Sequence, residues 1–161
     1  MAILLTDANI QGLLAERKPL APDYREKLQV KPKRGHKERE LDIIGVAGSE
    51  FRLILRQSEF NVLDFSVILV YCVPQSNQRI RIRRYNGKSH QHSNTIESVE
   101  FYDFHIHTAT ERYQRAGMRE DWFAEPTARY ADIHHAICCC LSDCGFDIPT
   151  DVQPSLFEEE G

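Results

Sequence analysis

The chain has 161 residues, of which 42% are hydrophobic and 27% are charged, and its formal net charge is −4 at pH 7. This length is enough for one domain with its own core, and the acidic balance excludes a protein that binds nucleic acid through bulk charge. No apolar run reaches the roughly 18 residues of a membrane span, and the opening MAILLTDANI is too short, and acidic too soon, for a signal peptide. Five cysteines, three of them adjacent, fit reduced thiols. We therefore expect a cytoplasmic protein without a membrane partner.

Helices are predicted near the N-terminus. Thr6 and Asp7 can cap a helix that runs to about Lys18, after which prolines interrupt it. Residues 23–29 suit a second, short helix. The basic segment 31–40, KPKRGHKERE, is predicted to be either a solvated connector or an arm that contacts phosphate.

Five strands are predicted to follow at short spacing, which most simply gives an antiparallel meander. Alternation of apolar and polar residues favours strands in this part of the chain. The most apolar segment is rich in β-branched residues, which are typical of a central strand. The predicted strands are residues 40–46, 50–58, 61–73, 79–83 and 102–107.

A long helix is predicted near the C-terminus. Pro126 suits its first turn, apolar residues recur at a period of about 3.6, and Gly145 can supply the C-cap after Cys144. The predicted architecture is α+β: a curved antiparallel β-sheet of about five strands, with N-terminal helices and one C-terminal helix packed on it. In this prediction residues 1–148 form a single domain and residues 149–161 an acidic tail.

Candidate functional residues concentrate in residues 79–113. This stretch holds four of the seven histidines, as the pairs His90/His92 and His105/His107, directly after a dense arginine run. An Asn-Gly turn and the polar loop after it would bring the first pair back towards the sheet.

Alternation along the two strands that flank this loop puts their polar side chains on one face. His105 and His107 share a face with Asp103. Arg81 and Arg83 share a face of the preceding strand. If the two strands pair, the guanidinium and imidazole rows lie side by side.

Two histidines on one strand face can bind a metal ion or transfer protons. The four histidines with Asp103 could hold a zinc-like ion, but the neighbouring arginines would repel a cation and no carboxylate cluster offsets them. We therefore expect no metal and no cofactor. The arginines fit an anionic substrate instead, because a guanidinium donates two parallel hydrogen bonds to phosphate.

These residue types are the usual set of a metal-independent ribonuclease. One group deprotonates the ribose 2′-hydroxyl, another protonates the leaving oxygen, and cations stabilise the charged intermediate. The predicted catalytic residues are His105, His107, His90 and His92. The predicted substrate-binding residues are Arg81, Arg83, Arg84, Tyr85, Asp103 and Arg112.

The central half of the chain carries a family resemblance. A long apolar strand, then RYNGKSHQHSN and then FYDFHIHTATERY resemble small bacterial proteins of unknown function from mobile elements, and are more weakly similar to TumE-like toxins of toxin–antitoxin pairs. The matching residues are Arg84, Tyr85, Asn86, His90, His92, His105 and His107. Asn-Gly stands where those toxins have Asp-Asn, and the C-terminal helix is additional. The resemblance implies a toxin-like or nuclease-like role.

Two functions of different classes are consistent with these residues. The first is a toxin-like endoribonuclease that acts on RNA phosphodiesters, with RNA and an antitoxin as its partners. The alternative is a non-enzymatic mobile-element or phage protein that binds or inhibits a host or antiphage protein complex. A small metal-dependent hydrolase is a third interpretation.

Overall fold

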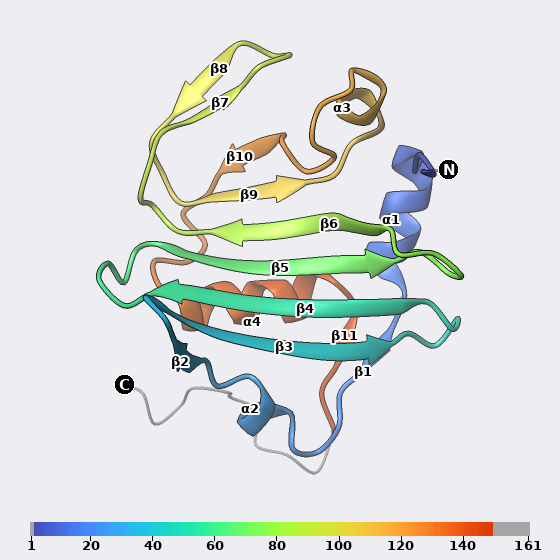
Figure 1. Ribbon diagram of the computed structural model, residues 1–161, viewed down its shortest axis with the longest axis vertical. Helices are drawn as coiled ribbons and strands as arrows, with labels where there is room; N and C mark the ends of the chain where they lie inside the picture. Colours follow the sequence, from blue (N-terminus) through green and yellow to red (C-terminus); the bar gives the residue numbers. More distant parts are fainter. Residues whose placement is uncertain (1, 150–161) are drawn as a thin grey trace.

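A seven-stranded sheet forms the centre of the protein in the computed structural model, which describes residues 2–149 (Figure 1). Its order is β10-β9-β6-β5-β4-β3-β2, and all neighbouring strands are antiparallel. The strands are β2 (Lys31–Lys33), β3 (His36–Ile44), β4 (Glu50–Ser58), β5 (Phe65–Cys72), β6 (Arg79–Asn86), β9 (His105–Thr108) and β10 (Ala124–Pro126). The α+β class and the antiparallel sheet are confirmed, whereas the predicted number of five strands is wrong. Curvature of the sheet stays a prediction.

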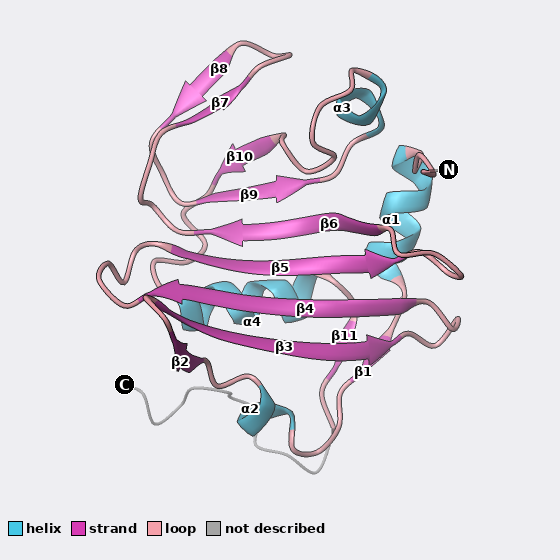
Figure 2. Cartoon of the chain, in the orientation of Figure 1, coloured by secondary structure: helices cyan, strands magenta, loops and turns pink. Residues whose placement is uncertain are grey.

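Four helices and two small sheets accompany the central sheet within residues 2–149 (Figure 2). The helices are α1 (Asp7–Ala15), α2 (Tyr24–Lys27), α3 (Glu111–Arg115) and α4 (Ile133–Asp143). The small sheets are the parallel pair β1 (Lys18–Pro19) with β11 (Phe146–Asp147) and the hairpin β7 (His92–Asn94) with β8 (Val99–Phe101). Among the described residues, no helix is both long and apolar enough to cross a membrane. The predicted tail, residues 149–161, lies outside the described residues except for residue 149, and a single domain over residues 1–148 stays a prediction.

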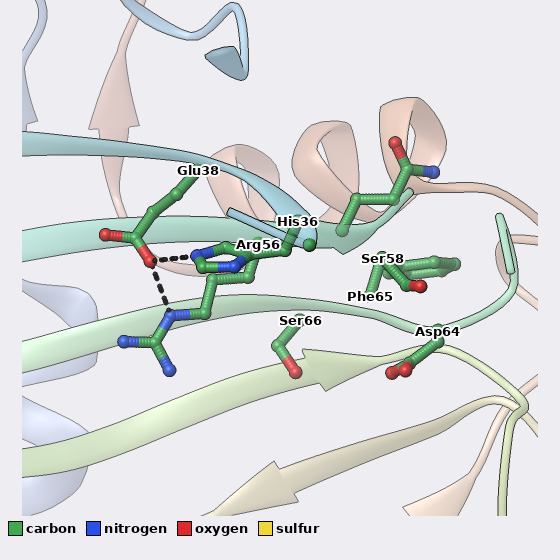
Figure 3. Close-up of a pocket in the computed structure, with 9 residues that line it drawn as sticks. His36, Glu38, Arg56, Ser58, Asp64, Phe65 and Ser66 are labelled. Atoms are coloured by element: carbon green, nitrogen blue, oxygen red, sulfur yellow. Dashed lines mark hydrogen bonds and ion pairs between the residues drawn. The ribbon is translucent and has the colours of Figure 1, made fainter. Parts of the chain in front are cut away.

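The two faces of the central sheet differ in chemistry. α4 lies behind the sheet in Figure 1, and the core forms between them: Phe51, Leu53 and Leu55 alternate along β4 and are buried there. Side chains at the intervening positions project from the opposite face, where Arg56 pairs with Ser66 of β5 (Figure 3). We call the face that carries Arg56 and Ser66 the open face.

An irregularity in β6 separates its arginines. The pairing of β6 with β5 shifts register so that Ile82 is an extra residue between Arg81 and Arg83. Such a bulge breaks the strict alternation of side chains. Arg83 therefore points towards α4, where its Nη1 lies 3.8 Å from Asp143 Oδ2. The prediction that Arg81 and Arg83 share a face is wrong.

Two segments that were predicted as a connector and as a polar loop contain strands. The basic segment 31–40 is a hairpin of β2 and β3, in which Lys33 pairs with His36 across Gly35. Asn86 ends β6 rather than opening a turn, and β7 lies inside the predicted polar loop. The segment that follows β6 therefore contains the small hairpin of β7 and β8.

The C-terminal helix is shorter than predicted. Pro126 ends β10, and α4 starts at Ile133. Its N-cap is Asp132, whose carboxylate accepts a hydrogen bond from the backbone N–H of His135 at 2.8 Å. A side-chain cap of this kind sets the start of a helix. The predicted C-terminal signal is confirmed, because Gly145 follows the helix with a φ of 75°.

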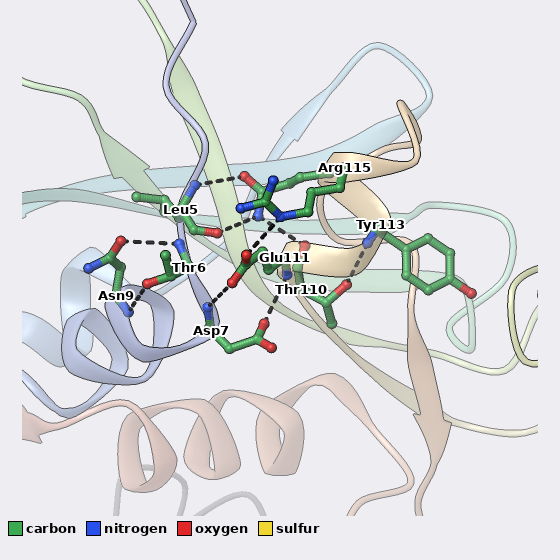
Figure 4. Close-up of polar contacts among 9 residues, drawn as sticks. Leu5, Thr6, Asp7, Asn9, Thr110, Glu111, Tyr113 and Arg115 are labelled. Carbon is green, nitrogen blue, oxygen red and sulfur yellow. Dashed lines mark hydrogen bonds and ion pairs between the residues drawn. The ribbon is translucent and has the colours of Figure 1, made fainter.

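Hydrogen bonds join the N-terminal ends of α1 and α3 (Figure 4). The predicted cap Thr6 is confirmed as the N-cap of α1. The backbone N–H of Glu111 donates to Asp7 Oδ1 at 2.9 Å, and Nε2 of Gln114 donates to the carbonyl oxygen of Leu5 at 3.0 Å. Because α3 follows β9 closely, these hydrogen bonds connect the end of β9, the strand that carries His105 and His107, to α1.

Gly87 lies where β6 approaches the loop between β4 and β5. A Cβ at this position would collide with the carbonyl oxygen of Leu63 and lie 2.8 Å from its carbonyl carbon. We expect Gly87→Ala to lower the free energy of unfolding by about 1–3 kcal/mol, as measured by urea denaturation. Gly12→Ala is the control, because Gly12 lies in α1 with open space around it, and alanine should stabilise the helix by about 0.5–1 kcal/mol. A Gly87→Ala protein as stable as the original would contradict this assignment.

Candidate functional site

Three histidines from two segments form a buried cluster. His105 and His107 lie on β9, and His92 lies on β7. The ring centroids are 4.9 Å apart for His92–His107 and for His105–His107, and 5.4 Å apart for His92–His105. One ring nitrogen of each lies within 4.8 Å of those of the other two. The loop after β6 therefore brings His92 back to the histidine strand. We call these three residues the histidine cluster.

Two rings of the histidine cluster are oriented by backbone carbonyls. The Nδ1–H of His105 donates to the carbonyl oxygen of Asp103 at 2.7 Å. The Nδ1–H of His107 donates to the carbonyl oxygen of Asp121 at 2.7 Å. A carbonyl can only accept, so the proton of each neutral ring is on Nδ1 and the lone pair is on Nε2.

His92 is oriented by a side-chain amide. Its Nε2 lies 2.9 Å from Oδ1 of Asn94. That amide is itself fixed by Ala124, whose N–H donates to Oδ1 at 3.0 Å and whose carbonyl accepts from Nδ2 at 2.7 Å. Oδ1 is therefore the acceptor, so His92 carries its proton on Nε2 and its lone pair on Nδ1.

The histidine cluster contains a buried acceptor that lacks a hydrogen bond. His105 is 0% exposed, and its Nε2 has no hydrogen-bond partner among residues 2–149. A buried polar atom left unsatisfied costs roughly 1–3 kcal/mol, and a bound ion is one reason for such an atom. Histidines that bind metals commonly donate their other ring N–H to a carbonyl or a carboxylate. His105 and His107 show that arrangement.

Burial keeps the rings of the histidine cluster neutral at pH 7. It lowers the pKa of His105 to about 4 and the pKa of His107 to about 2, and it also lowers the pKa of His92. The positive charge of Arg84 acts in the same direction on all three rings. A histidine that is uncharged at pH 7 cannot supply the proton that a general acid transfers. A ring with so low a pKa is also a weak base, so these shifts weigh against the acid and base roles of His105 and His107, which stay predictions; a neutral imidazole is the form that binds a metal ion.

These pKa values predict how the metal-free protein responds to acid. Below pH 6.5, the ordinary value for histidine, the unfolded chain takes up protons that folded His105 binds only near pH 4. Protonation then favours the unfolded state. In EDTA, we expect the free energy of unfolding to fall steadily from pH 7.5 to pH 5, as measured by urea denaturation.

The matched variants for this pH dependence are His105→Gln and His135→Gln. The first removes a buried titrating ring and should make the fall in stability between pH 7.5 and pH 5 shallower. The second removes an exposed ring on α4, far from the histidine cluster in the fold, and is the control. Identical slopes for both variants would show that His105 binds protons equally well in the folded and unfolded states.

Aromatic side chains surround the histidine cluster. The ring centroid of Phe101 lies 5.4 Å from that of His92 and 5.6 Å from that of His105. The ring of Trp122 lies 5.2 Å from that of His92, and its indole N–H donates to the carbonyl oxygen of Ser93 at 2.8 Å. A shell of this kind restricts water and lowers the local dielectric constant, which are two ways in which proteins tune a metal site.

A buried carboxylate offsets the arginines near the histidine cluster. Asp121 is 0% exposed, and its Oδ2 lies 3.1 Å from Nε of Arg84 and 3.9 Å from Nε of Arg81. Its Oδ1 lies 3.6 Å from Nε of Arg119. Glu120 lies 3.9 Å from Arg81 on the other side. The expectation of no metal depended on repulsion between these arginines and a cation. The carboxylates of Asp121 and Glu120 reduce that repulsion.

The histidine cluster borders a pocket of about 310 Å³. His92 and His107 form part of its wall, together with Arg84, Arg119 and the exposed ring of His90. Arg84 uses its Nε for the ion pair with a buried carboxylate, and in the described part of the chain its two Nη groups make no hydrogen bond. These groups are free to donate to an anion in the pocket.

Of the six predicted substrate-binding residues, Arg84 lines this pocket; Arg81 does not, although it pairs with Asp121, and neither do the other four. Tyr85 is fully buried under α4, and Arg83 lies beside it. The carboxylate of Asp103 is exposed, and Arg112 forms an ion pair with Glu97 at 2.6 Å. None of these four lines the pocket beside the histidine cluster. The substrate-binding role of these four residues stays a prediction; Arg83 and Tyr85 contact Asp143 of α4, on the opposite face of the sheet from the histidines.

The sequence interpretation missed residues that orient the site. Arg119, Asp121 and Trp122 belong to an Arg-Glu-Asp-Trp run in a segment whose sequence predicts an ordinary loop. A compact run of charges beside the chain's single tryptophan is a signal that could have indicated them. Asn94 is two positions from His92, so strand alternation places it on the same face.

Comparisons with models of protein families, with curated proteins and with solved structures find no match for this chain. The resemblance to mobile-element proteins and to TumE-like toxins therefore stays a prediction. Function has to follow from the geometry of the histidine cluster and its pocket.

Proposed function

We propose that the protein is a zinc-dependent hydrolase of phosphate esters, with His92, His105 and His107 as the metal ligands. The observation that carries this proposal is three neutral rings, each held by a hydrogen bond from one nitrogen, whose ligand atoms lie within 4.8 Å of one another. Imidazole suits zinc. Three protein ligands leave the fourth position of a tetrahedral zinc ion for water, which is the arrangement of catalytic sites.

The ligands have to close slightly around an ion. Zn–N bonds of about 2.0–2.1 Å in a tetrahedral site hold nitrogens about 3.4 Å apart, compared with separations of up to 4.8 Å in the structure. His92 lies on the hairpin of β7 and β8, which is separate from the central sheet. A small shift of this hairpin can therefore complete the site without breaking a strand pair of the central sheet.

The chemistry follows from the fourth position. A zinc ion held by His92, His105 and His107 would supply a water molecule of lowered pKa as the nucleophile. Hydrolysis would form a bond from the water oxygen to phosphorus and break the bond from phosphorus to the alcohol oxygen, which would leave with a proton. His90 is the exposed imidazole of the pocket, and we assign the delivery of that proton to it. The products are the phosphate that carries the new oxygen and the free alcohol.

The charges of the pocket favour an anionic ester. Arg84 and Arg119 line the pocket, and Arg81 pairs with the same buried carboxylate as they do; their three positive charges balance the three negative charges of Asp64, Glu120 and Asp121. A bound zinc ion adds two more positive charges. Guanidinium groups bind phosphate oxygens through parallel hydrogen bonds and stabilise the charge that develops during transfer.

Hydrolysis of bis(4-nitrophenyl) phosphate tests the proposal. Protein loaded with zinc is expected to release 4-nitrophenol, to lose the activity in EDTA and to regain it when zinc is restored. His107→Ala should lower the rate by about 100-fold or more, because it removes a ligand, and even outer-shell changes cost 10–100-fold. His135→Ala, at an exposed position of α4, should hydrolyse at the original rate.

Two outcomes would redirect the assignment. Cleavage of RNA that continues in EDTA but is lost in His105→Ala would favour the metal-independent ribonuclease. Zinc bound by the histidine cluster without hydrolysis of any phosphate ester would end the enzymatic proposal, and the non-enzymatic interaction protein would be the better account.

A further inference from the structure

The pocket beside the histidine cluster continues into a second hollow on the open face. This hollow has a volume of about 500 Å³ and shares Asp64, Phe65 and Ser66 with the first pocket. Figure 3 shows Ser66 and Asp64 at this junction, with Arg56 and Glu38 farther along. We call the two hollows together the open-face groove.

Basic side chains cover a buried carboxylate at the far end of the open-face groove. Glu38 is 9% exposed and accepts hydrogen bonds from Nε of Arg56 at 3.0 Å and from Nζ of Lys33 at 3.2 Å. Nε2 of His36 lies 3.2 Å from the same carboxylate. The side chains of Arg56 and Lys33 are 55% and 58% exposed. This end is therefore basic towards solvent, although the chain as a whole is acidic.

The near end of the groove repeats this arrangement. Asp121 is 0% exposed, whereas the side chain of Arg119 is 43% exposed above it, and Arg84 lines the wall. The shared wall between the two ends is neutral except for Asp64. The open-face groove thus offers two basic ends to one elongated anion.

One row of side chains across the sheet gives the length of the groove. The row runs through His105, Asn86, Ser66, Arg56 and Glu38, each of which pairs directly with the next. Neighbouring strands are about 4.8 Å apart, so the four steps span about 19 Å. Stacked nucleotides of one strand advance about 3.4 Å each, so the row has the length of about five nucleotides.

We infer that the open-face groove binds a single-stranded polynucleotide whose phosphates contact both basic ends. The inference rests on the proposed function, because it places a backbone phosphate of this strand at the histidine cluster. A small phosphate ester would use the near end alone and would not reach Lys33 and Arg56. A basic groove that follows the backbone is the usual means of binding a single strand.

Fluorescence anisotropy with labelled oligonucleotides tests this inference. The probes are the octamers rU8 and dT8 and the dinucleotide UpU, all measured in EDTA so that zinc-dependent cleavage is excluded. At least one octamer should bind more tightly than UpU. In Lys33→Ala/Arg56→Ala the octamer should bind at least about fivefold more weakly, and the slope of log K against log salt should fall by about 1.4, or about 0.7 for each phosphate that the variant no longer neutralises. Binding of UpU at the near end should not change.

Arg52→Ala is the matched control. Arg52 lies on β4 and on the same face as Arg56, but it pairs with Asp42 at 2.9 Å outside the groove. Its removal should leave octamer binding unchanged. Lys33→Ala alone, at an exposed position of the short strand β2, gives a second test if the double variant does not fold. The inference is overturned if neither octamer binds the folded protein, or if the far-end variants bind octamers as Arg52→Ala does.

The two octamers also separate RNA from DNA. Tighter binding of rU8 would indicate contacts with the 2′-hydroxyl and assign the groove to RNA. Equal binding would indicate recognition of the shared phosphate backbone. If the protein binds zinc and cleaves phosphodiesters but does not bind the octamers, the polynucleotide inference is wrong and the hydrolase proposal stands. If the protein binds octamers but does not bind added zinc in a separate titration, the hydrolase proposal is wrong and the groove inference stands.

Discussion

Zinc at about 100 times its dissociation constant is expected to raise the melting temperature of the metal-free protein by about 5–10 °C. A ligand that binds only the folded state adds about 2.7 kcal/mol at that concentration, and each kcal/mol moves the melting temperature of a chain of this size by about 2–4 °C. The structural reason is Nε2 of His105, which is buried without a hydrogen-bond partner in the described residues and would gain a metal bond. Scanning calorimetry of protein stripped with EDTA and then titrated with zinc measures the shift.

The controls for this shift are two histidine variants. His107→Ala should show almost no rise in melting temperature with zinc, since it removes one of three ligands. His135→Ala removes an exposed histidine and should show the full rise. The same rise in both variants would place the zinc elsewhere on the protein, for example at the cysteines of α4.

Asp121→Ala is expected to lower the free energy of unfolding by about 3–5 kcal/mol, the usual cost of removing one partner from a buried ion pair. The carboxylate is 0% exposed and lies 3.1 Å from Nε of Arg84. Its removal leaves Arg84, whose side chain is only 13% exposed, without its counterion. Arg119 and Arg81 lose the same partner. Urea denaturation measures the loss.

Asp42→Ala is the matched control for Asp121→Ala. Asp42 also pairs with an arginine, Arg52, at 2.9 Å, but its side chain is 75% exposed. Exposed pairs contribute about 0–1 kcal/mol, so this variant should be almost as stable as the original protein. Adding Arg84→Met to Asp121→Ala should recover part of the lost stability, because it removes the unpaired charge. A loss from Asp121→Ala as small as that from Asp42→Ala would contradict the assigned role of this carboxylate.

Strand alternation explains why part of the site could be predicted from the sequence. His105 and His107 are two positions apart, and a period of two puts them on one face wherever the strand lies in the sheet. The apolar residues between and before them mark the opposite face, and Phe104 and Ile106 do pack against the core. The same rule predicted the apolar face that receives α4, whereas the short spacing of the strands predicted the antiparallel sheet.

Features that depend on pairing between distant segments could not be predicted in this way. The extra residue Ile82 in β6 is defined only by its partner strand, and it moves Arg83 to the helix side and Arg84 to the side of the histidines. The sequence predicted a helix start at Pro126, but α4 begins after Asp132, whose side chain accepts a hydrogen bond from the backbone N–H of His135. The partnership of Asp121 with Arg84 joins two segments that no local pattern connects.

Zinc-edge anomalous diffraction from crystals of the zinc-loaded protein tests the central claim most directly. We expect one strong anomalous peak per chain, bonded to Nδ1 of His92 and to Nε2 of both His105 and His107, with its fourth position open to the pocket lined by Arg84. A peak on other residues, or a histidine cluster that stays empty while zinc is in excess, would contradict the claim that these three imidazoles form a metal centre.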